Sequence, residues 1–340
     1  MEKRNVLLEV KDLKTCFPLK TGTIRAVNGV SFTIYEGDTF GLIGESGCGK
    51  SQTLFSILKL LKKPGIISGG SILYKGKNLT AMSVQDIRKI RGREIAQIFQ
   101  EPMTALNPVL TIKNQLYEAI ERSGITSGRE KKQRAIELLR LVGIPEPEKR
   151  LSEYPHQFSG GMRQRAMIAI ALGENPKLLL ADEPTTALDV TIQDQIMTLI
   201  NDLKDKLGMS VILVTHDLSV VAQMCNRVAV MYAGMIMEMC DTITLFSKPR
   251  HPYTRALMNS LPGSSGKILE TITGSPPDLA HPPTGCPFAA RCAYAENACM
   301  ECCPDLTEIE PGHATRCFRS DVVKSFKGLI PAGEETSDAK

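Results

Sequence analysis

The sequence lacks any apolar run close to the roughly 18 consecutive residues that a membrane-spanning helix requires. Its opening stretch, MEKRNVLLEV, also lacks the long apolar core of a secretory signal. We therefore expect the protein to remain in the cytosol, where it can still dock on a membrane partner. The sequence also has little excess of charge of either sign, because 41 Lys and Arg against 37 Asp and Glu leave a formal net charge of +4. Such a small excess does not predict a nucleic-acid partner, which normally needs a concentrated basic face.

An internal repeat of fixed period is also absent. The composition is 42% hydrophobic and 23% charged, which is ordinary for a globular protein and excludes a disordered, collagen-like or coiled-coil chain. A length of 340 residues predicts about two domains. Beyond residue 245 repeated prolines and a cysteine cluster change the character of the sequence. We therefore predict a first domain at 1–245, a small Cys-rich C-terminal module at 246–325 and a flexible tail at 326–340.

Short apolar runs alternate with helical patterns along the first domain, which favours an α/β fold with parallel strands. Strands are expected at 6–10, 30–35, 39–43, around 72, 95–99, 178–181 and 211–215. Helices are expected at 52–61, at 191–207 and throughout the stretch from about 103 to 175. Within that stretch Ala135, Leu138, Leu139 and Val142 follow helical spacing.

The segment GESGCGKS at residues 44–51 matches the pattern G-x-x-x-x-G-K-[ST], between an apolar run and a helical pattern. Its glycines let backbone N–H groups turn toward phosphate oxygens, and the following helix adds the positive end of its dipole. Lys50 is expected to reach the β- and γ-phosphates, and Ser51 to ligate Mg²⁺. The residues predicted to surround the nucleotide here are Gly44, Ser46, Gly47, Cys48, Gly49, Lys50, Ser51 and Gln52.

A second signal is LLLADEP at residues 178–184, where an apolar strand ends in two acids. A carboxylate at the end of a buried strand is costly unless it holds a cation, so Asp182 is predicted to hold Mg²⁺. Glu183 follows it, placed to orient or deprotonate an attacking water. Two acids after a strand are by themselves more often a helix cap. Together with the glycine loop they predict nucleotide hydrolysis.

Between these motifs lies FSGGMRQR at residues 158–165, which resembles the signature sequence of ATP-binding cassette (ABC) ATPases. The usual Leu-Ser-Gly-Gly-Gln form is altered at both ends, and the Phe and Met resemble the variant of peptide-importer ATPases. Ser159, Gly160 and Gly161 open a helix expected to start near Met162, which makes a second anion site. In this family that site faces the γ-phosphate held by the partner subunit, so the resemblance implies that ATP binds between two subunits.

Other positions match the family residue by residue. Gln100, in IFQEP, resembles the glutamine that contacts Mg²⁺ and water and reports to the membrane subunits. Asp189, in ALD at 187–189, resembles the loop that crosses the dimer, and His216 resembles the switch histidine that holds the γ-phosphate. Phe17 is the candidate for stacking on adenine, although such a Phe usually belongs to a core. The resemblance spans residues 5–245 and implies a P-loop NTPase fold of the ABC ATPase type, with a RecA-like core, an antiparallel β subdomain and an α-helical subdomain.

Six of the ten cysteines lie between Cys286 and Cys317, and in a reducing cytosol such clustering indicates metal before disulfides. HPYTRAL at 251–257 and the region after it resemble the C-terminal extension of dipeptide, oligopeptide and nickel importer ATPases, where a [4Fe-4S] cluster can be bound. The resemblance implies that the four ligands are Cys286, Cys292, Cys299 and Cys317. A Cys₄ zinc site and unliganded thiols are the alternatives. Cys302 and Cys303 lie outside the pattern.

These features predict the ATP-hydrolysing subunit of an ABC importer for dipeptides or oligopeptides, with ATP, Mg²⁺ and a [4Fe-4S] cluster as cofactors. The implied location is peripheral, at the cytoplasmic face of the inner membrane. The implied partners are a second ATPase subunit, usually a paralogue, two transmembrane permease subunits and an extracytoplasmic peptide-binding protein, but no nucleic acid.

Three alternatives to this function stay open. The first is the ATPase of a nickel importer. The second is a soluble ABC ATPase acting on DNA or ribosomes, which would need coiled-coil insertions or tandem cassettes that the sequence lacks. The third is a metal- or redox-sensing protein whose cassette is only a switch, which Glu183 and His216 argue against.

Overall fold

The computed structural model describes residues 4–20, 22–186, 188–260 and 272–321. The chain forms two compact units, each assembled from separated stretches of sequence. The first unit comprises Met1–Leu7, Ile34–Thr39 and Ala81–Val214, and the second comprises Leu8–Thr33, Phe40–Thr80 and Thr215–Lys340. The predicted tail at 326–340 lies outside the described residues.

The first unit is built on parallel strands in the order β8-β7-β6. Their bounds are β6 (Ile95–Ile98), β7 (Leu178–Asp182) and β8 (Ser210–Thr215). Every residue of β7 and β8 is buried, which explains their almost uninterrupted apolar sequence. The predictions of strands at 95–99, 178–181 and 211–215 are confirmed.

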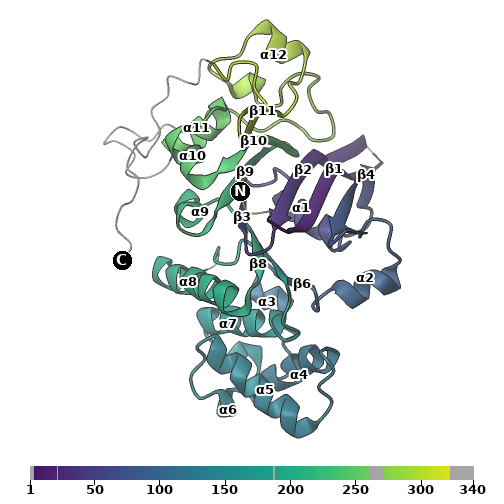
Figure 1. Cartoon of the computed structure of the whole chain (residues 1–340), viewed down its shortest axis with the longest axis vertical. Helices are drawn as coiled ribbons and strands as arrows, with labels where there is room; N and C mark the ends of the chain where they lie inside the picture. The colour runs from purple at the N-terminus through teal and green to yellow at the C-terminus, as the bar shows by residue number, and fades with distance from the viewer. Residues whose placement is uncertain (1–3, 21, 187, 261–271, 322–340) are drawn as a thin grey trace. The chain divides into compact units, whose positions relative to one another are not determined.

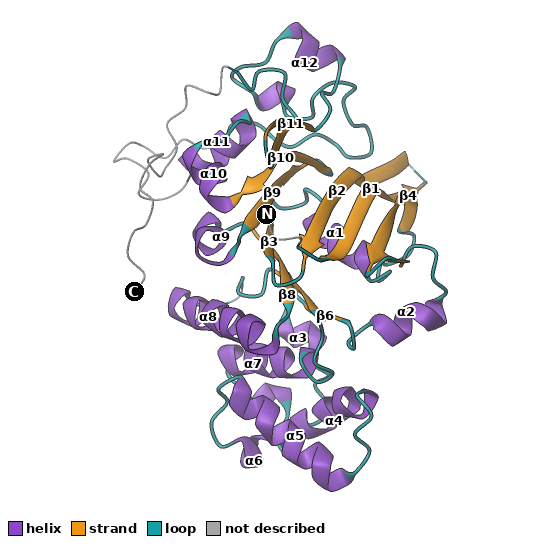
Figure 2. Cartoon of the chain, viewed as in Figure 1, coloured by secondary structure: helices purple, strands orange, loops and turns teal. Residues whose placement is uncertain are grey.

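Helices are the predominant regular structure of the first unit, as Figure 2 shows. Their bounds are α2 (Val84–Ile90), α3 (Pro102–Ala105), α4 (Ile112–Arg122), α5 (Gly128–Leu141), α6 (Pro147–Arg150), α7 (Gly160–Ala171) and α8 (Val190–Leu207), with a 3₁₀ turn η1 at Pro155–Gln157. Helices α4, α5 and α7 pack against one another. Ala135, Leu138 and Leu139 form the buried stripe of α5, as their spacing predicted.

The second unit contains a sheet with strand order β2-β1-β4-β5, in which β4 pairs antiparallel with both β1 and β5 (Figure 1). The bounds are β1 (Val6–Leu19), β2 (Gly22–Tyr35), β4 (Ile66–Tyr74) and β5 (Lys77–Asn78). The strands predicted at 6–10 and 30–35 were too short. Exposed Lys11 and Lys14 interrupt the apolar pattern of β1, because they lie on its solvent side while pairing continues to Cys16.

The second unit also holds strands in the order β11-β12-β10-β9-β3, in which only β3 and β9 run parallel to each other. The bounds are β3 (Thr39–Ile43), β9 (Arg227–Tyr232), β10 (Met235–Asp241), β11 (Thr307–Glu310) and β12 (His313–Thr315). The helices are α1 (Lys50–Ile57), α9 (Leu218–Met224), α10 (Thr242–Ser247), α11 (Pro252–Asn259) and α12 (Asn297–Glu301), with a 3₁₀ turn η2 at Ala289–Arg291. Because β12 pairs with β10 at Glu238↔Thr315, the C-terminal module shares a sheet with the segment that precedes it.

The helix predicted at 52–61 begins and ends earlier in the structure, at Lys50 and Ile57. It ends early because Lys59 adopts a left-handed conformation with φ of 51°, and the amide of Leu60 donates back to the carbonyl of Phe55. Among the described helices, none combines the length and the hydropathy that a membrane crossing requires.

Candidate functional site

The phosphate loop, residues 44–51, leaves the fully buried strand β3 and enters α1. Gly44 and Gly49 have φ of 149° and 106°, values that favour glycine. A Cβ on Gly44 would lie 2.1 Å from the carbonyl oxygen of Met231, and one on Gly49 would lie 2.2 Å from that of Ala26. Only glycine therefore lets the loop press against these two backbone segments.

Lys50 lies at the start of α1, and its side chain turns back over the loop. Its Nζ atom donates to the carbonyl oxygens of Gly44 at 2.8 Å and Glu45 at 3.0 Å, and the residue is 4% exposed. The buried ammonium is thus solvated by two neutral carbonyls of the loop itself. Ser51 follows in the first turn of α1.

The remaining loop residues differ in exposure. Ser46 and Gly47 are exposed, whereas Gln52 is half-buried. Cys48 is buried, and that burial raises the pKa of its thiol, so that the side chain packs as a neutral group. The loop therefore offers backbone N–H groups, one ammonium and the two hydroxyls of Ser46 and Ser51 to a ligand.

The carboxylates predicted for catalysis lie in the first unit, at the carboxyl end of β7. Asp182 pairs with Val214 of β8 and is 2% exposed. Glu183 also donates its amide to the carbonyl of Val214, at 2.9 Å, but has a left-handed φ of 44°. A non-glycine residue in this conformation is strained, and such residues gather at functional sites.

Gln100 and Glu183, 83 positions apart in sequence, meet in the first unit. The Gln100 amide donates to Oε2 of Glu183 at 3.1 Å, and the Thr186 hydroxyl donates to the same oxygen at 2.8 Å. Two donors from different segments fix the orientation of this carboxylate. A held carboxylate beside an amide can accept a proton from a water and orient it.

The signature segment starts its helix two residues earlier than predicted, at Gly160. The cause is Ser159, whose hydroxyl oxygen accepts from the Met162 amide at 3.3 Å and caps α7. Ser159 and Gly160 are exposed, and Gly161 is half-buried, so the helix N-terminus is open to an anion.

Asp189 caps α8 by accepting from the Ile192 amide at 3.0 Å. Its neighbour Ala187 lies outside the described residues. His216 is exposed directly after β8, and Phe17 is a half-buried residue of β1. A Cβ on Gly65 would lie 2.5 Å from the Phe17 ring, so glycine makes room for it.

The predicted nucleotide residues are divided between the two units. Gln100, Asp182, Glu183, the signature segment and Asp189 belong to the first, while Phe17, the phosphate loop and His216 belong to the second. Each set has the local geometry described above, and their convergence on one nucleotide stays a prediction.

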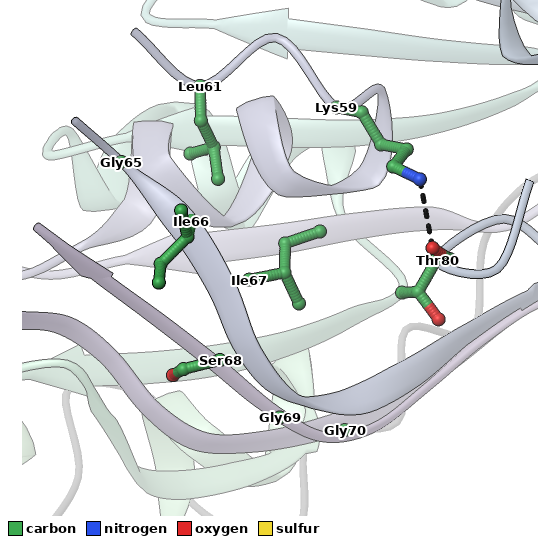
Figure 3. Close-up of a pocket in the computed structure, with 9 residues that line it drawn as sticks. All are labelled: Lys59, Leu61, Gly65, Ile66, Ile67, Ser68, Gly69, Gly70 and Thr80. Atoms are coloured by element: carbon green, nitrogen blue, oxygen red, sulfur yellow. Dashed lines mark hydrogen bonds between the residues drawn. The ribbon is translucent and has the colours of Figure 1, made fainter. Parts of the chain in front are cut away.

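A separate hollow of about 510 Å³ lies in the second unit beside β4 (Figure 3). Its lining consists of Lys59, Leu61, Gly65, Ile66, Ile67, Ser68, Gly69, Gly70 and Thr80. Figure 3 shows that the ammonium of Lys59 donates to the Thr80 carbonyl, at 2.9 Å. The described lining contains no carboxylate, thiol or imidazole, so this hollow has no group for acid–base chemistry.

The four cysteines implied as cluster ligands line one cavity in the second unit, together with His251. We call it the cysteine cavity; its cysteines are Cys286, Cys292, Cys299 and Cys317. Backbone amides two residues further along donate to the sulfurs of Cys292 and Cys317, at 3.4 and 3.3 Å, and the Phe288 amide contacts Cys286 in the same way. Such N–H···S bonds stabilise thiolates. Cys302 and Cys303 are not in the described lining.

The spacing of these sulfurs bears on which metal fits. Zinc holds thiolates at about 2.3 Å, which places four sulfurs about 3.8 Å apart. Among the described residues, no three sulfurs of this cavity lie within 4.8 Å of one another. Four thiolates that line one cavity can serve either a single ion or a larger cluster in which each binds its own iron. The cavity itself is small, about 20 Å³, and a [4Fe-4S] cluster would need more room than that.

Burial raises the pKa of Cys286 from 9.0 to about 11 and that of Cys317 to about 12. Without a cation the thiols are therefore protonated at neutral pH. Binding of a metal would have to release these protons, as thiolate ligation always does.

Glu238, Cys240 and His313 form another buried group, whose ligand atoms lie within 4.8 Å of one another. Oε1 of Glu238 bonds to His313 Nε2 at 2.7 Å and accepts from the Arg250 amide, and Oε2 accepts from the His251 amide at 3.0 Å. Because both carboxylate oxygens are already satisfied, this group fastens the C-terminal module to β10 and is not an open metal site.

Sequence reasoning missed a set of contacts from the C-terminal module to the phosphate loop. Arg291 binds the carboxylate of Glu45, and the Tyr253 hydroxyl accepts from the Glu45 amide. Tyr253 stood within the HPYTRAL segment, but no local pattern links residues that lie 208 and 246 positions away from Glu45. The sequence carried no signal for this pairing.

Two family models match the chain. The model described as "ABC transporter" matches residues 27–186, and the one described as "Oligopeptide/dipeptide transporter, C-terminal region" matches residues 237–299. The second match reaches from β10 to Cys299 of the cysteine cavity.

Curated relatives resemble the chain over nearly its whole length. A probable peptide ABC transporter ATP-binding protein, y4tR of Sinorhizobium fredii, is 52% identical over 94% of this chain and 97% of its own length. The dipeptide transport ATP-binding protein DppD of Bacillus subtilis is 49% identical, over 94% and 96%. Among solved structures, the dimeric post-hydrolysis state of the ATP-binding cassette MJ0796, bound to ADP and Pi, has a TM-score of 0.63 at 30% identity, covering 69% of this chain and 99% of that one.

Proposed function

This chain belongs to the ATP-binding subunits of peptide ABC transporters, and on that basis we propose that it drives import of short peptides through separate permease subunits. Its enzymatic activity is ATP hydrolysis. The names of the relatives supply the cargo class, since they are peptide and dipeptide transport proteins. We further propose that the chain binds peripherally at the cytoplasmic face of the membrane, with an extracytoplasmic binding protein delivering the peptide.

The proposed nucleotide binding rests on the phosphate loop. We assign its backbone amides and the N-terminus of α1 to the β- and γ-phosphate oxygens, whose charge Lys50 at the start of that helix would neutralise. Mg²⁺, when bound, supplies further positive charge that stabilises the phosphoryl oxygens. Ser51 and the buried carboxylate of Asp182 are hard oxygen donors of the kind that this ion prefers.

One observation carries the proposed chemistry, the carboxylate of Glu183 held by Gln100 and Thr186. Glu183 accepts a proton from a water as that water attacks the γ-phosphorus, while the bond to the ADP oxygen breaks in line with the attack. Gln100 orients the same water through its amide. His216 is assigned to the γ-phosphate.

The exposed signature segment supports a second subunit in the working assembly. Ser159 and Gly160 present an open helix N-terminus, which we assign to the γ-phosphate bound by a partner subunit, usually a paralogue. The cassette MJ0796, a dimer with ADP and Pi bound, gives a precedent. Asp189 lies near the proposed dimer interface, and Phe17 is assigned to the adenine.

A [4Fe-4S] cluster is our proposal for the cysteine cavity. Besides the four cysteines that line the cavity, His251 supports it. Its Nδ1 accepts from the Tyr253 amide at 3.0 Å, so the proton of the neutral ring resides on Nε2, which has no hydrogen-bond partner of good geometry among the described residues. Burial lowers the pKa of His251 to about 3, partly opposed by the Arg316 backbone. His251 lines the cavity together with the four cysteines, so a ligand bound there would compete with the Arg316 backbone for this N–H.

The proposed transport function is tested by reconstituting the chain with its permeases and second ATPase subunit in proteoliposomes. ATP-dependent uptake of a radiolabelled dipeptide is expected, with AMP-PNP as the control without hydrolysis. Accumulation of Ni²⁺ without dipeptide uptake would favour a nickel importer, and ATPase stimulation by nucleic acid alone would favour a soluble ABC ATPase.

A further inference from the structure

Arg291 binds the phosphate loop through the side chain of Glu45. Glu45 is not among the loop residues predicted to contact the nucleotide. The NH1 and NH2 atoms of Arg291 donate to the two carboxylate oxygens of Glu45, at 2.7 and 3.0 Å. The Arg291 side chain is only 5% exposed. Hydrogen bonding to Glu45 raises the pKa of Arg291, so the guanidinium is a fixed cation. A bidentate pair of this kind sets orientation as well as distance.

Two tyrosines add hydrogen bonds to the contact between Arg291 and the phosphate loop. The Tyr253 hydroxyl accepts from the Glu45 amide at 2.9 Å, and the Tyr232 hydroxyl accepts from NH1 of Arg291 at 3.1 Å. Both tyrosines are buried, with ring centroids 4.7 Å apart. Glu45 is therefore fixed by its backbone and by its side chain at once.

Fixing Glu45 also fixes the cation that meets the phosphates. The Glu45 carbonyl is one of the two oxygens that accept from the Lys50 ammonium, and it also accepts from the Cys48 amide at 3.3 Å. If Glu45 shifts, the turn of the loop and the resting place of Lys50 shift with it.

The residues that hold Glu45 also lie next to the cysteine cavity. Arg291 is the residue before Cys292, and both belong to the chain around η2. Phe288 lines the cavity, and its ring lies 5.4 Å from that of Tyr232 and 5.2 Å from that of Tyr253. Two routes, one along the backbone and one through packed rings, therefore lead from the cavity to Glu45.

We infer that Arg291 is a positioning residue for ATP binding, and that through it the affinity of the phosphate loop depends on whether the cysteine cavity is filled. The first clause stands on the contacts of Arg291 and Glu45. The second clause rests on the cluster proposed above.

The first clause is tested by Mg·ATP binding to the full-length chain, followed with a fluorescent ATP analogue. Arg291→Ala is expected to weaken binding about tenfold, as loss of a buried charge-assisted pair implies. In the assembled transporter it should raise KM more than it lowers kcat. Glu45→Gln combined with Arg291→Ala should add little to either change alone, because both break one pair.

Arg250 offers a matched control, since its guanidinium is also buried and pairs with Glu310 in the same C-terminal module. Arg250→Ala should lower the melting temperature without changing the Kd for Mg·ATP. An Arg291→Ala chain that binds Mg·ATP like the wild type, or additive effects of the Glu45 and Arg291 changes, would overturn the positioning role.

The second clause compares anaerobically purified chain with the same chain stripped of iron, with iron content measured in both. Stripping should weaken Mg·ATP binding about tenfold in the wild type and leave Arg291→Ala unchanged. Equal affinities of loaded and stripped wild type would overturn the coupling. A chain that never holds iron refutes the cluster and the coupling together, while the positioning role is still decided by the Arg291 variants.

Discussion

The phosphate loop and the cysteine cavity belong to the same unit and are built in opposite ways. The loop is local: eight consecutive residues, 44–51, are shaped by backbone contacts and close packing at Gly44 and Gly49. The cysteines of the cavity come from residues 286–317, a segment of short helices, turns and strands, and His251 joins them from the start of α11. The loop therefore owes its shape to backbone packing, whereas the cavity owes its character to side chains brought together from distant positions.

This difference teaches how the two sites should respond to damage. A loop shaped by backbone packing loses function when one charge is removed but keeps its fold. A cavity whose buried thiols have no cation loses structure when its filling is removed, because binding energy and folding energy are then the same quantity. In the proposed coupling, a loss of structure in the cysteine cavity would affect the phosphate loop through the contact between Arg291 and Glu45.

The largest expected effect of a single change is that of Lys50→Ala on nucleotide binding. Removing the buried ammonium that we assign to the β- and γ-phosphates should weaken Mg·ATP binding by about a hundredfold or more, with little change in melting temperature. Equilibrium dialysis with labelled ATP measures it. Lys59→Ala is the matched control, since Lys59 donates to Thr80 in the hollow of Figure 3 and should leave the affinity unchanged. Equal losses of affinity in both variants would contradict a specific role of Lys50 in binding Mg·ATP.

Cys292→Ser sharpens the other side of the comparison. It should reduce the iron content of anaerobically purified chain from about four atoms to near zero, abolish the brown colour and lower the melting temperature, because four thiolates complete the cluster. Cys302→Ser should change none of these, since Cys302 is exposed and outside the cavity lining. A colourless wild-type chain with stoichiometric zinc would contradict the iron–sulfur assignment.

The smallest expected effect is a loss of stability of the iron-free chain at alkaline pH. The folded pKa values of Cys286 and Cys317 are raised from 9.0 to about 11 and about 12, chiefly by burial. The stability these neutral thiols provide is fully present below about pH 9 and is lost as pH rises through 11 to 12. Melting curves between pH 8 and 11 measure it, and a Cys286→Ala, Cys317→Ala chain should show a shallower decline. An identical slope in that chain would mean that other groups cause the decline.

Much of the fold was predictable because its signals are local. Solid apolar runs predicted β3, β7 and β8, and helical spacing predicted α5. The length of β1 was missed, because charged residues on its solvent side hide the alternation. The start of α7 was misplaced by two residues, because the capping role of Ser159 outweighed the first apolar residue.

The candidate sites show the same limit. The phosphate loop and the two acids after β7 are contiguous motifs, so their residues could be named from the sequence. Gln100 was named only from the family resemblance, which did not predict its contact with Glu183. The pairing of Arg291 with Glu45 had no sequence signal at all. Contacts between segments that are distant in the sequence produce no local periodicity or residue spacing, so the sequence does not predict them.

The central claim is that this chain hydrolyses Mg·ATP with the Glu183 carboxylate as the group that takes a proton from water. The most direct measurement is the single-turnover rate of ATP hydrolysis in the assembled transporter, for wild type and for Glu183→Gln, alongside ATP affinity. The account predicts a rate at least about a hundredfold lower with ATP still bound at wild-type affinity. A variant that hydrolyses ATP at the wild-type rate would contradict it.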